Sequence, residues 1–228
     1  MSDLRSPTPE AAPRWNWVPV RSLGARQRDR ITTHLLALDE RDRYLRFGHA
    51  ASDAQIQRYV EALDFDQDEI FGIFNRKLEL IAMAHLAFPL AGPGGAPPTV
   101  AEFGVSVSSA ARGRGFGRRL FEHAMLHARN RRVGALVIHA LSENTAMLRI
   151  ASSLGAIVCR EGSESEARLQ LPPDDLASHF DALVETQAAE IDYRLKQQGI
   201  AVDRVIGTFA GGRGARHPEV GVADDRGT

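Results

Sequence analysis

Six residues near the middle of the chain combine three glycines with two arginines. They are Arg112, Gly113, Arg114, Gly115, Phe116 and Gly117. A glycine has no Cβ, so a diphosphate can come close to the main chain, and a guanidinium adds charge-assisted hydrogen bonds to phosphate oxygens. The stretch therefore favours anion binding. The alternative is an ordinary turn whose glycines serve tight packing and whose arginines are solvated.

The residues on either side place this turn between a strand and a helix. Before it, Phe103, Val105 and Val107 alternate with small residues, which is the period of a strand. After it, apolar residues recur at helical spacing, at Phe116, Leu120, Phe121, Ala124, Met125 and Ala128. The first N–H groups of a helix lack partners inside the helix, and the helix dipole favours an anion there. Strand, turn and helix thus agree on a phosphate ligand.

The glycine spacing separates three kinds of nucleotide site. A Walker A loop needs GxxxxGK[ST], which is absent. A dinucleotide fingerprint needs GxGxxG, but counting from Gly115 places Leu120 where the third glycine should be. Because an antiparallel hairpin is also predicted before the motif, a nicotinamide-dependent Rossmann enzyme is disfavoured. The remaining pattern is RxxGxG at Arg112, Gly115 and Gly117.

This RxxGxG pattern resembles the acetyl-coenzyme A (acetyl-CoA) signature of the GNAT superfamily of N-acetyltransferases. Within that superfamily, the chain is closest in pattern to the GNAT domain of bacterial protein lysine acetyltransferases. The resemblance covers about residues 65–171, including the apolar run 135–139 and a second helix from Ser142 to Gly155. In the family pattern NxxAxxLYxxxGF, Asn144, Ile150 and Gly155 are in register, while Met147, Ala151 and Ala156 replace the alanine, tyrosine and phenylalanine.

The resemblance implies an α/β fold with a mixed, centrally splayed sheet flanked by helices. It also implies acetyl-CoA as cosubstrate and direct transfer of acetyl to a primary amine, either a small molecule or a protein lysine. The alternative is a catalytically weak acyl-CoA-binding regulatory or interaction module. By the same resemblance, Arg43-Tyr-Leu-Arg-Phe47 matches a stretch of the bacterial branch. We give equal weight to two interpretations of this stretch: a role in substrate binding, and a charged helix end with an aromatic staple.

Acyl transfer to an amine needs a base that deprotonates the ammonium, a donor for the oxyanion and a group that protonates the departing thiolate. The resemblance implies that Glu102, in the Ala101-Glu-Phe103 strand, is the general base, and we expect its carboxylate to be half-buried. A solvated residue at a strand start is the alternative. Val105 is implied as the oxyanion donor and Val107 as a partner of the pantetheine amides. Asn144 is expected to bind pantetheine, to cap a helix, or both.

Other candidate residues carry weaker signals. Ala151 stands where the family often has a tyrosine that protonates the thiolate, so no general acid is assigned. Four arginines could meet the 3′-phosphate of coenzyme A or form a solvated helix face, namely Arg118, Arg119, Arg131 and Arg132. His123 and His127 are one helical turn apart but lack a third ligand, so we expect surface histidines and no metal. Cys159 is expected to be a buried structural thiol.

Composition limits the possible partners. Among 228 residues, 28 Lys and Arg are offset by 29 Asp and Glu, and no long basic block is present, so no nucleic-acid partner is implied. No run approaches the roughly 18 apolar residues of a membrane span, and the N-terminus has no apolar core for a signal peptide. A soluble, cytoplasmic protein without a membrane partner is therefore expected.

The organisation along the chain is predicted as follows. A disordered leader at 1–13 precedes the acetyltransferase domain at 14–171, an amphipathic helix at 172–200 and a loose tail at 201–228. Within the domain we expect a first strand at 15–20, a helix at 25–38, a second helix reaching residue 63, a hairpin of strands at 69–74 and 78–88, an exposed loop at 89–98, and last strands at 156–160 and 166–171. The C-terminal helix is expected to pack on its own chain, with a homodimer as the alternative.

Overall fold

The computed structural model describes residues 19–89 and 99–172. Its strands are β1 (Arg21–Leu23), β2 (Glu69–Phe74), β3 (Leu80–Ala87), β4 (Val100–Val107), β5 (Ala135–Leu141), β6 (Ile157–Glu161) and β7 (Glu164–Gln170). Its helices are η1 (Ala25–Gln27), α1 (Arg28–Leu36), α2 (Glu40–Phe47), α3 (Asp53–Glu61), η3 (Ser109–Ala111), α4 (Phe116–Asn130) and α5 (Thr145–Ser153). The predicted leader, tail and C-terminal helix, except for Pro172, and residues 90–98 of the predicted loop lie outside the described residues.

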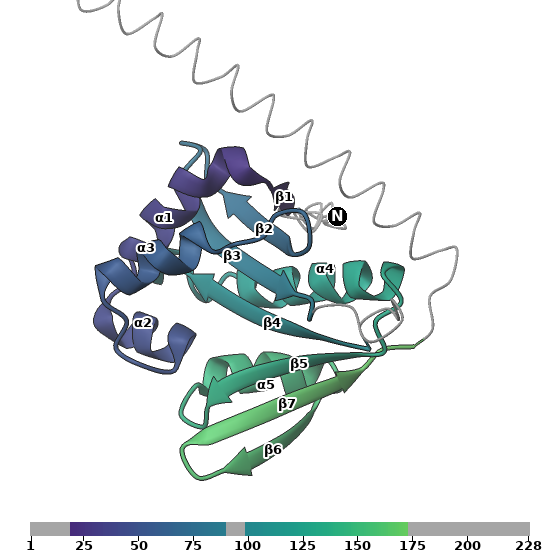
Figure 1. The fold of residues 1–228 in the computed structure, drawn as a ribbon. Helices are drawn as coiled ribbons and strands as arrows, with labels where there is room; N and C mark the ends of the chain where they lie inside the picture. Colours follow the sequence, from purple (N-terminus) through teal and green to yellow (C-terminus); the bar gives the residue numbers. More distant parts are fainter. Residues whose placement is uncertain (1–18, 90–98, 173–228) are drawn as a thin grey trace, which may run out of the picture.

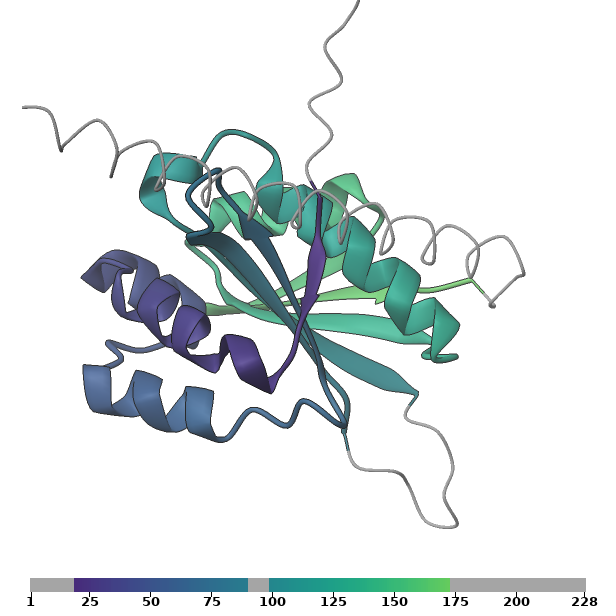
Figure 2. The same ribbon diagram turned by 90° about the horizontal axis from the view of Figure 1, so that it is seen from above.

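The seven strands form one mixed sheet in the order β1-β2-β3-β4-β5-β7-β6. Only the β4–β5 pair is parallel, and every other neighbouring pair is antiparallel. The helices α1, α2 and α3 cover one face, and α4 and α5 cover the other (Figures 1 and 2). This architecture confirms the predicted α/β fold with helices on both faces, and the predicted β2–β3 hairpin.

Each face of the sheet has its own apolar core. On the α4 and α5 face, Phe71, Phe103, Phe121 and Leu136 belong to the larger cluster, and the rings of Phe103 and Phe121 meet edge to face at 4.8 Å. On the other face, Ile31 from α1 packs in a smaller cluster with residues of α3, β2 and β3. Because strand residues alternate between faces, β4 can present Phe103 to one core and Glu102, Gly104 and Ser106 to the α1–α3 side.

Local signals explain where the helices begin and end. The side chain of Asp39 accepts a hydrogen bond from the N–H of Asp42 at 2.8 Å, and Gly48 ends α2 with a φ of 76°. The charged stretch from Asp39 to Phe47 therefore forms a helix of its own. Ser52 and Gln55 form a capping box at the start of α3. None of the described helices has the length and apolar character needed to cross a membrane.

The position predicted for the first strand, 15–20, is wrong for the part of that range that the structure describes. The strand begins at Arg21, and neither Pro19 nor Val20 belongs to it. Pro19 has no N–H to donate to a ladder with β2, which disfavours pairing at this end of the strand. Val20 is nevertheless buried in the larger core, which explains the apolar pattern there. The helix predicted at 25–38 is a 3₁₀ turn followed by α1, which ends at Leu36.

Candidate active site

The sheet opens at its centre, between β4 and β5. These strands pair only from Val100 to Glu102 on β4 and from Ala135 to Val137 on β5, although β4 continues to Val107 and β5 to Leu141. Figure 1 shows the two strands diverging beyond this point. This divergence is the predicted central splay. It leaves one edge of β4 without a strand partner over its last five residues.

The register of β4 determines which of its backbone groups face the gap. Ser108 donates its N–H to the carbonyl of Ile81 at 2.9 Å, and Val107 lies opposite Ala82 and Val105 opposite Ala84. In an antiparallel ladder, hydrogen-bonded and non-hydrogen-bonded pairs alternate. The backbone groups of Val105 and Val107 therefore point away from β3. Their N–H and C=O groups are directed toward the gap between β4 and β5.

The glycine turn follows β4 and η3 and leads directly into α4. Gly113 and Gly115 have φ values of 71° and 79°, a conformation that glycine adopts without a steric cost. A Cβ at either position would meet nothing within 4 Å, so the main chain there is open to a ligand. Gly115 is the N-cap of α4, and no side chain caps this helix end. The N–H groups of the first turn, which begins at Phe116, are thus directed at this open space.

Gly117 has a different role from the two glycines before it. It lies in the first turn of α4, and a Cβ there would approach Ile150 Cδ1 to 3.2 Å. This glycine lets α4 pack closely against α5. Close packing, the alternative weighed for the whole motif, therefore applies to Gly117.

The arginines of the turn already contact protein groups. Arg112 forms an ion pair with Asp42 of α2, whose side chain is 7% exposed. The Arg114 guanidinium carbon lies 4.9 Å from the centre of the Phe116 ring. Arg118 bonds Glu122 at 2.8 Å. The positive charge of the predicted anion site is thus partly neutralised by carboxylates in this structure.

Of the four arginines considered for the 3′-phosphate, two are far from the turn. Arg131 and Arg132 follow α4, whose 15 residues separate them from the turn by about 20 Å. Arg131 also donates to the carbonyl of Gln67 at 2.6 Å and lies 3.8 Å from the centre of the Phe88 ring. Only Arg118 and Arg119, at the start of α4, remain near the turn.

Two cavities lie along the gap. The first, which we call the turn cavity, has a volume of about 500 Å³ and extends from α2 and the end of β4 to the glycine turn and α5. The second, the glutamate cavity, has a volume of about 790 Å³ and extends from Glu102 to the β6–β7 hairpin. Both are lined by Leu45, Arg46, Val105, Asn144 and Met147. The two cavities therefore adjoin at the splay, where a long ligand could pass from one to the other.

Glu102 lines the glutamate cavity at the last paired position of β4. Its side chain is exposed, which is the environment expected of the alternative, a solvated residue, and not the half-buried one that would suit a base. Three further carboxylates line the same cavity, those of Glu161, Glu164 and Glu166 on the β6–β7 hairpin. The combined charge makes this cavity suited to a cation, such as the ammonium form of an amine.

Asn144 joins the two halves of the site. Its side chain accepts the N–H of Met147 at 3.2 Å, which confirms the predicted N-cap of α5. Its Nδ2 also donates to the carbonyl of Leu45 on α2 at 3.4 Å. This contact spans the gap where the two cavities adjoin. Ala151, in contrast, is completely buried in the larger core and offers no proton donor to the site.

The weaker sequence candidates lie elsewhere than expected. His123 is 3% exposed, and its ring packs edge to face on Phe71 at 4.6 Å. His127 pairs its Nδ1 with Glu69 Oε2 at 2.5 Å, so neither is the surface histidine that we expected. Cys159 is exposed and lines the glutamate cavity, which corrects the expectation of a buried thiol. Among the residues described, no group of three His, Cys, Asp or Glu side chains could hold a metal ion.

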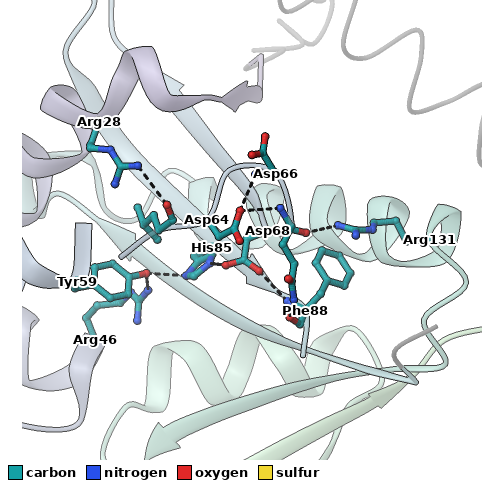
Figure 3. A network of polar contacts seen from close by, with 11 residues as sticks. Arg28, Arg46, Tyr59, Asp64, Asp66, Asp68, His85, Phe88 and Arg131 are labelled. Carbon is teal, nitrogen blue, oxygen red and sulfur yellow. Dashed lines mark hydrogen bonds and ion pairs between the residues drawn. The ribbon is translucent and has the colours of Figure 1, made fainter. Parts of the chain in front are cut away.

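Sequence reasoning missed a polar chain beside the site. It runs from Arg46 through Tyr59 and His85 to Asp68 (Figure 3). These residues come from α2, α3, β3 and the segment before β2, and no short motif connects them. The carboxylates of Glu161, Glu164 and Glu166 had a usable signal, because three glutamates fall within six residues next to a glycine turn.

Comparisons with known proteins agree with this geometry. A sequence profile described as the acetyltransferase (GNAT) family matches residues 33–156. No curated protein sequence matched the chain. Among solved structures, the GNAT domain of S. lividans PAT is similar, with a TM-score of 0.56 and 23% identity over 67% of this chain and 89% of that one.

Two further solved structures share the arrangement of elements. The yncA protein of Salmonella typhimurium, determined with its cofactor acetyl-CoA, gives a TM-score of 0.53 at 18% identity and covers 70% of this chain and 96% of its own. A GNAT-family acetyltransferase of Streptococcus pneumoniae gives 0.54 at 9% identity and covers 68% and 100%. At these identities the likeness concerns the fold.

Proposed function

Because the chain belongs to the acetyltransferase (GNAT) family, we propose that it transfers acetyl from acetyl-CoA directly to a primary amine. The observation that carries this proposal is the pair of adjoining cavities at the splay. One reaches the open glycine turn, and the other contains Glu102. A cosubstrate with a diphosphate at one end and a thioester at the other suits the first cavity, and a cationic acceptor suits the second.

The turn offers what the diphosphate of acetyl-CoA needs. Gly113 and Gly115 leave the main chain open, and the first N–H groups of α4 point into that space. Arg114 adds charge, as does Arg112 once its ion pair with Asp42 is exchanged for one with phosphate. Phe116 and Gly117 continue the wall of the same cavity. We therefore assign residues 112–117 to the diphosphate.

The gap between β4 and β5 suits the pantetheine arm. The pantetheine arm can form hydrogen bonds with the N–H and C=O groups of Val107, as an additional strand would. Asn144 lies at the boundary of the two cavities and is assigned to the same arm. The N–H of Val105, next along the strand, is assigned to the thioester oxygen.

The reaction then follows from the groups around the glutamate cavity. Glu102 accepts a proton from the ammonium, which frees the lone pair of the amine nitrogen. That nitrogen bonds to the thioester carbonyl carbon, and the π electrons of the C=O bond move to oxygen, which meets the N–H of Val105. When the C=O bond forms again, the C–S bond breaks and its electron pair leaves with sulfur as the thiolate. The nitrogen gives its extra proton to water, which leaves a neutral amide. Because Glu102 is exposed, it can release its proton to water.

The acidic lining of the glutamate cavity supports an amine as the acceptor. Four glutamates attract the ammonium form and would repel an acceptor whose charge is negative. Both small polyamines and lysine side chains in proteins carry such an ammonium group. We propose that the enzyme acts on one of these two classes of amine in the cytoplasm.

One observation favours the second candidate, a regulatory module that binds acyl-CoA without efficient turnover. An alanine, Ala151, stands at the position of the family tyrosine, so that position supplies no hydroxyl group to the thiolate. A thiolate is nonetheless a tolerable leaving group near neutral pH, because the thiol of a free cysteine has a pKa of about 8.5. Transfer without a dedicated acid is therefore the first expectation.

An acceptor panel tests the proposal. Purified protein and acetyl-CoA are incubated with polyamines, amino acids and lysine peptides, while free thiol is measured and acetylated products are identified by mass spectrometry. We expect thiol release that depends on the acceptor, with cationic amines preferred to acidic ones. Tight acetyl-CoA binding without an acetylated product from any amine would favour the regulatory module instead.

A further inference from the structure

A chain of three side-chain hydrogen bonds ends at the junction of the two cavities. Arg46 Nη2 donates to the Tyr59 hydroxyl at 2.8 Å, and the hydroxyl lies 2.8 Å from His85 Nδ1. His85 Nε2 lies 2.9 Å from Asp68 Oδ2, and Asp68 Oδ1 accepts the N–H of Phe88 at 3.0 Å. Figure 3 shows the four side chains in line, from α2 to the end of β3.

Burial fixes the direction of these hydrogen bonds. Removal from water raises the pKa of Tyr59, so its hydroxyl keeps its proton at neutral pH. Burial also lowers the pKa of His85, partly opposed by its hydrogen bond to Asp68, so the ring is neutral. The neutral ring donates from Nε2 to the Asp68 carboxylate and accepts at Nδ1 from Tyr59. The phenol oxygen then accepts from Arg46, so the chain places a cation at one end and an anion at the other.

The cationic end is held in a defined position. Arg46 packs on β4 at Gly104, where a Cβ would lie 2.8 Å from the guanidinium carbon. Only a glycine at 104 leaves room for the guanidinium at this height above the strand. The guanidinium carbon also lies 5.4 Å from the centre of the Tyr59 ring. Packing and hydrogen bonding together thus fix Arg46 next to Val105. Both residues line both cavities.

This arginine has binding capacity that the protein leaves unused. Its Nε is buried and makes no hydrogen bond within the part of the chain that the structure describes. No carboxylate of residues 19–89 and 99–172 lies within ion-pair distance of its guanidinium. Of the Nη donors, only Nη2 is used among the residues described, by Tyr59, and Arg46 lines both cavities, so the guanidinium can donate to a ligand group there.

The charges around the glutamate cavity indicate what Arg46 could do. Its described lining contains four glutamates, and Arg46 is the only lysine or arginine among these lining residues. Four carboxylates favour an incoming ammonium but oppose any negative charge that develops during the reaction. A positive group at the end of the cavity where the thioester oxygen becomes negative would offset that repulsion. Arg46 occupies this end, beside the strand residue whose N–H faces the gap.

We propose that Arg46 is a further catalytic residue whose guanidinium stabilises the oxyanion formed on the thioester oxygen, and that Tyr59, His85 and Asp68 are the residues that position it. The inference rests on the proposed acetyl transfer and adds a cationic group to the N–H of Val105. As the amine nitrogen bonds to the carbonyl carbon, the C=O π electrons move to oxygen, and Arg46 donates a hydrogen bond to that oxygen. The oxygen pair then forms the C=O bond again, the C–S bond breaks and its bonding pair leaves with sulfur as the thiolate, and the nitrogen loses its extra proton to water.

The first test compares Arg46→Ala with Arg41→Ala. Arg41 lies on the same helix with its side chain 73% exposed and lines neither cavity, so its replacement removes an equal charge away from the site. Loss of one oxyanion donor typically lowers kcat by about 10² to 10³. We expect a loss of that size in single-turnover transfer for Arg46→Ala, an unchanged Kd for acetyl-CoA, and a rate close to wild type for Arg41→Ala.

Two further variants move Arg46 without removing it. Gly104→Ala places a methyl group against the guanidinium, and Tyr59→Phe deletes its hydrogen-bond partner but keeps the ring. Both should lower kcat, by less than Arg46→Ala, with the affinity for acetyl-CoA unchanged. They also keep the inference testable if Arg46→Ala does not fold. Added methylguanidinium should restore part of the rate of folded Arg46→Ala. If the defect of this variant were purely structural, methylguanidinium would not restore the rate.

Separate outcomes overturn the inference and the proposed function. Equal transfer rates in wild type, Arg46→Ala and Gly104→Ala would remove Arg46 from the chemistry while leaving acetyl transfer intact. A proportional loss of acetyl-CoA binding and rate would make Arg46 a binding residue and would also overturn the inference. Absence of transfer by the wild-type protein to every amine would overturn the proposed function, and the role of Arg46 would fall with it.

Discussion

A buried histidine should make the stability of this protein depend on pH in a specific way. His34 of α1 is 3% exposed, and its Nδ1 donates to the carbonyl of Leu80 at 3.0 Å. Its Nε2 accepts from the hydroxyl of Ser106 on β4 at 2.9 Å. The ring thereby joins α1 to the strand that carries Glu102 and Val105. Its neutral form is the one that the folded state accommodates.

The size and the sign of the effect follow from the pKa of His34. Burial, with a smaller contribution from the charge of Arg46, lowers this pKa from 6.5 to about 4, although hydrogen bonding with the backbone of Leu80 and Ser106 opposes the shift. A lowered pKa means that the unfolded chain binds more protons than the folded one between those values. The stabilisation is therefore complete above pH 6.5 and is lost as the pH falls toward 4. A fall of the pKa from 6.5 to about 4, at 1.36 kcal/mol per pKa unit, corresponds to about 3 kcal/mol.

Urea unfolding of the wild-type protein and of His34→Gln measures this contribution. Other groups titrate in both proteins, so their effects cancel when the two free energies of unfolding are subtracted. The difference between wild type and variant should decrease by about 3 kcal/mol from pH 7 to pH 4. A difference that stays constant over this range, or that increases as the pH falls, would refute the assignment of a buried, neutral ring.

Two further predictions concern the turn cavity and the glutamate cavity. Gly115→Asp should weaken acetyl-CoA binding, measured by calorimetry, by more than the tenfold that corresponds to about 1.4 kcal/mol, because it adds negative charge at the diphosphate position. Gly115→Ala has the same strained φ without the charge, so equal losses in the two variants would contradict the electrostatic reason. Cys159 is the single cysteine and is exposed, so one thiol should react with an aromatic disulfide reagent in the native protein. A thiol that reacts only after unfolding would contradict its place in the structure.

The parts of the fold that the sequence predicts well are those determined by neighbouring residues. The alternation from Phe103 to Val107 and the glycines that follow it define strand, turn and helix locally, and the structure places β4, the turn and α4 there. The N-cap at Asn144 depends equally on local chemistry. The same holds for the hairpin of β2 and β3, whose two apolar runs are close together in sequence.

The features that were predicted wrongly depend on the position of an element in the sheet. The run Ile157–Cys159 is apolar and looks buried, but β6 is the last strand of the sheet, and Ile157 is 73% exposed. His123 looks like a residue at the rim of an amphipathic helix. It is buried because α4 also packs over β2, where Phe71 meets its ring. Neither the order of strands nor the reach of a helix can be read from local periodicity.

The predictions for the site also divide into those that depend on neighbouring residues and those that depend on the assembled fold. The residues assigned to the diphosphate, from Arg112 to Gly117, lie in one motif, and their spacing is enough to propose them. The polar chain to Arg46 could not, because Tyr59, His85 and Asp68 meet only when α3 and β3 come together. The exposure of Glu102 also depends on the splay, since the separation of β5 from β4 after Val137 leaves its side chain open to the cavity.

The most direct test of the central claim is the single-turnover rate of acetyl transfer by Glu102→Gln. The substitution keeps the size of an exposed side chain and removes its negative charge together with its ability to accept a proton. General-base catalysis contributes roughly 10² to 10⁴ in rate, so the variant should transfer acetyl more slowly by that factor with an unchanged Kd for acetyl-CoA. Transfer at the wild-type rate, or a joint loss of transfer and acetyl-CoA binding, would contradict the assignment of Glu102 as the base.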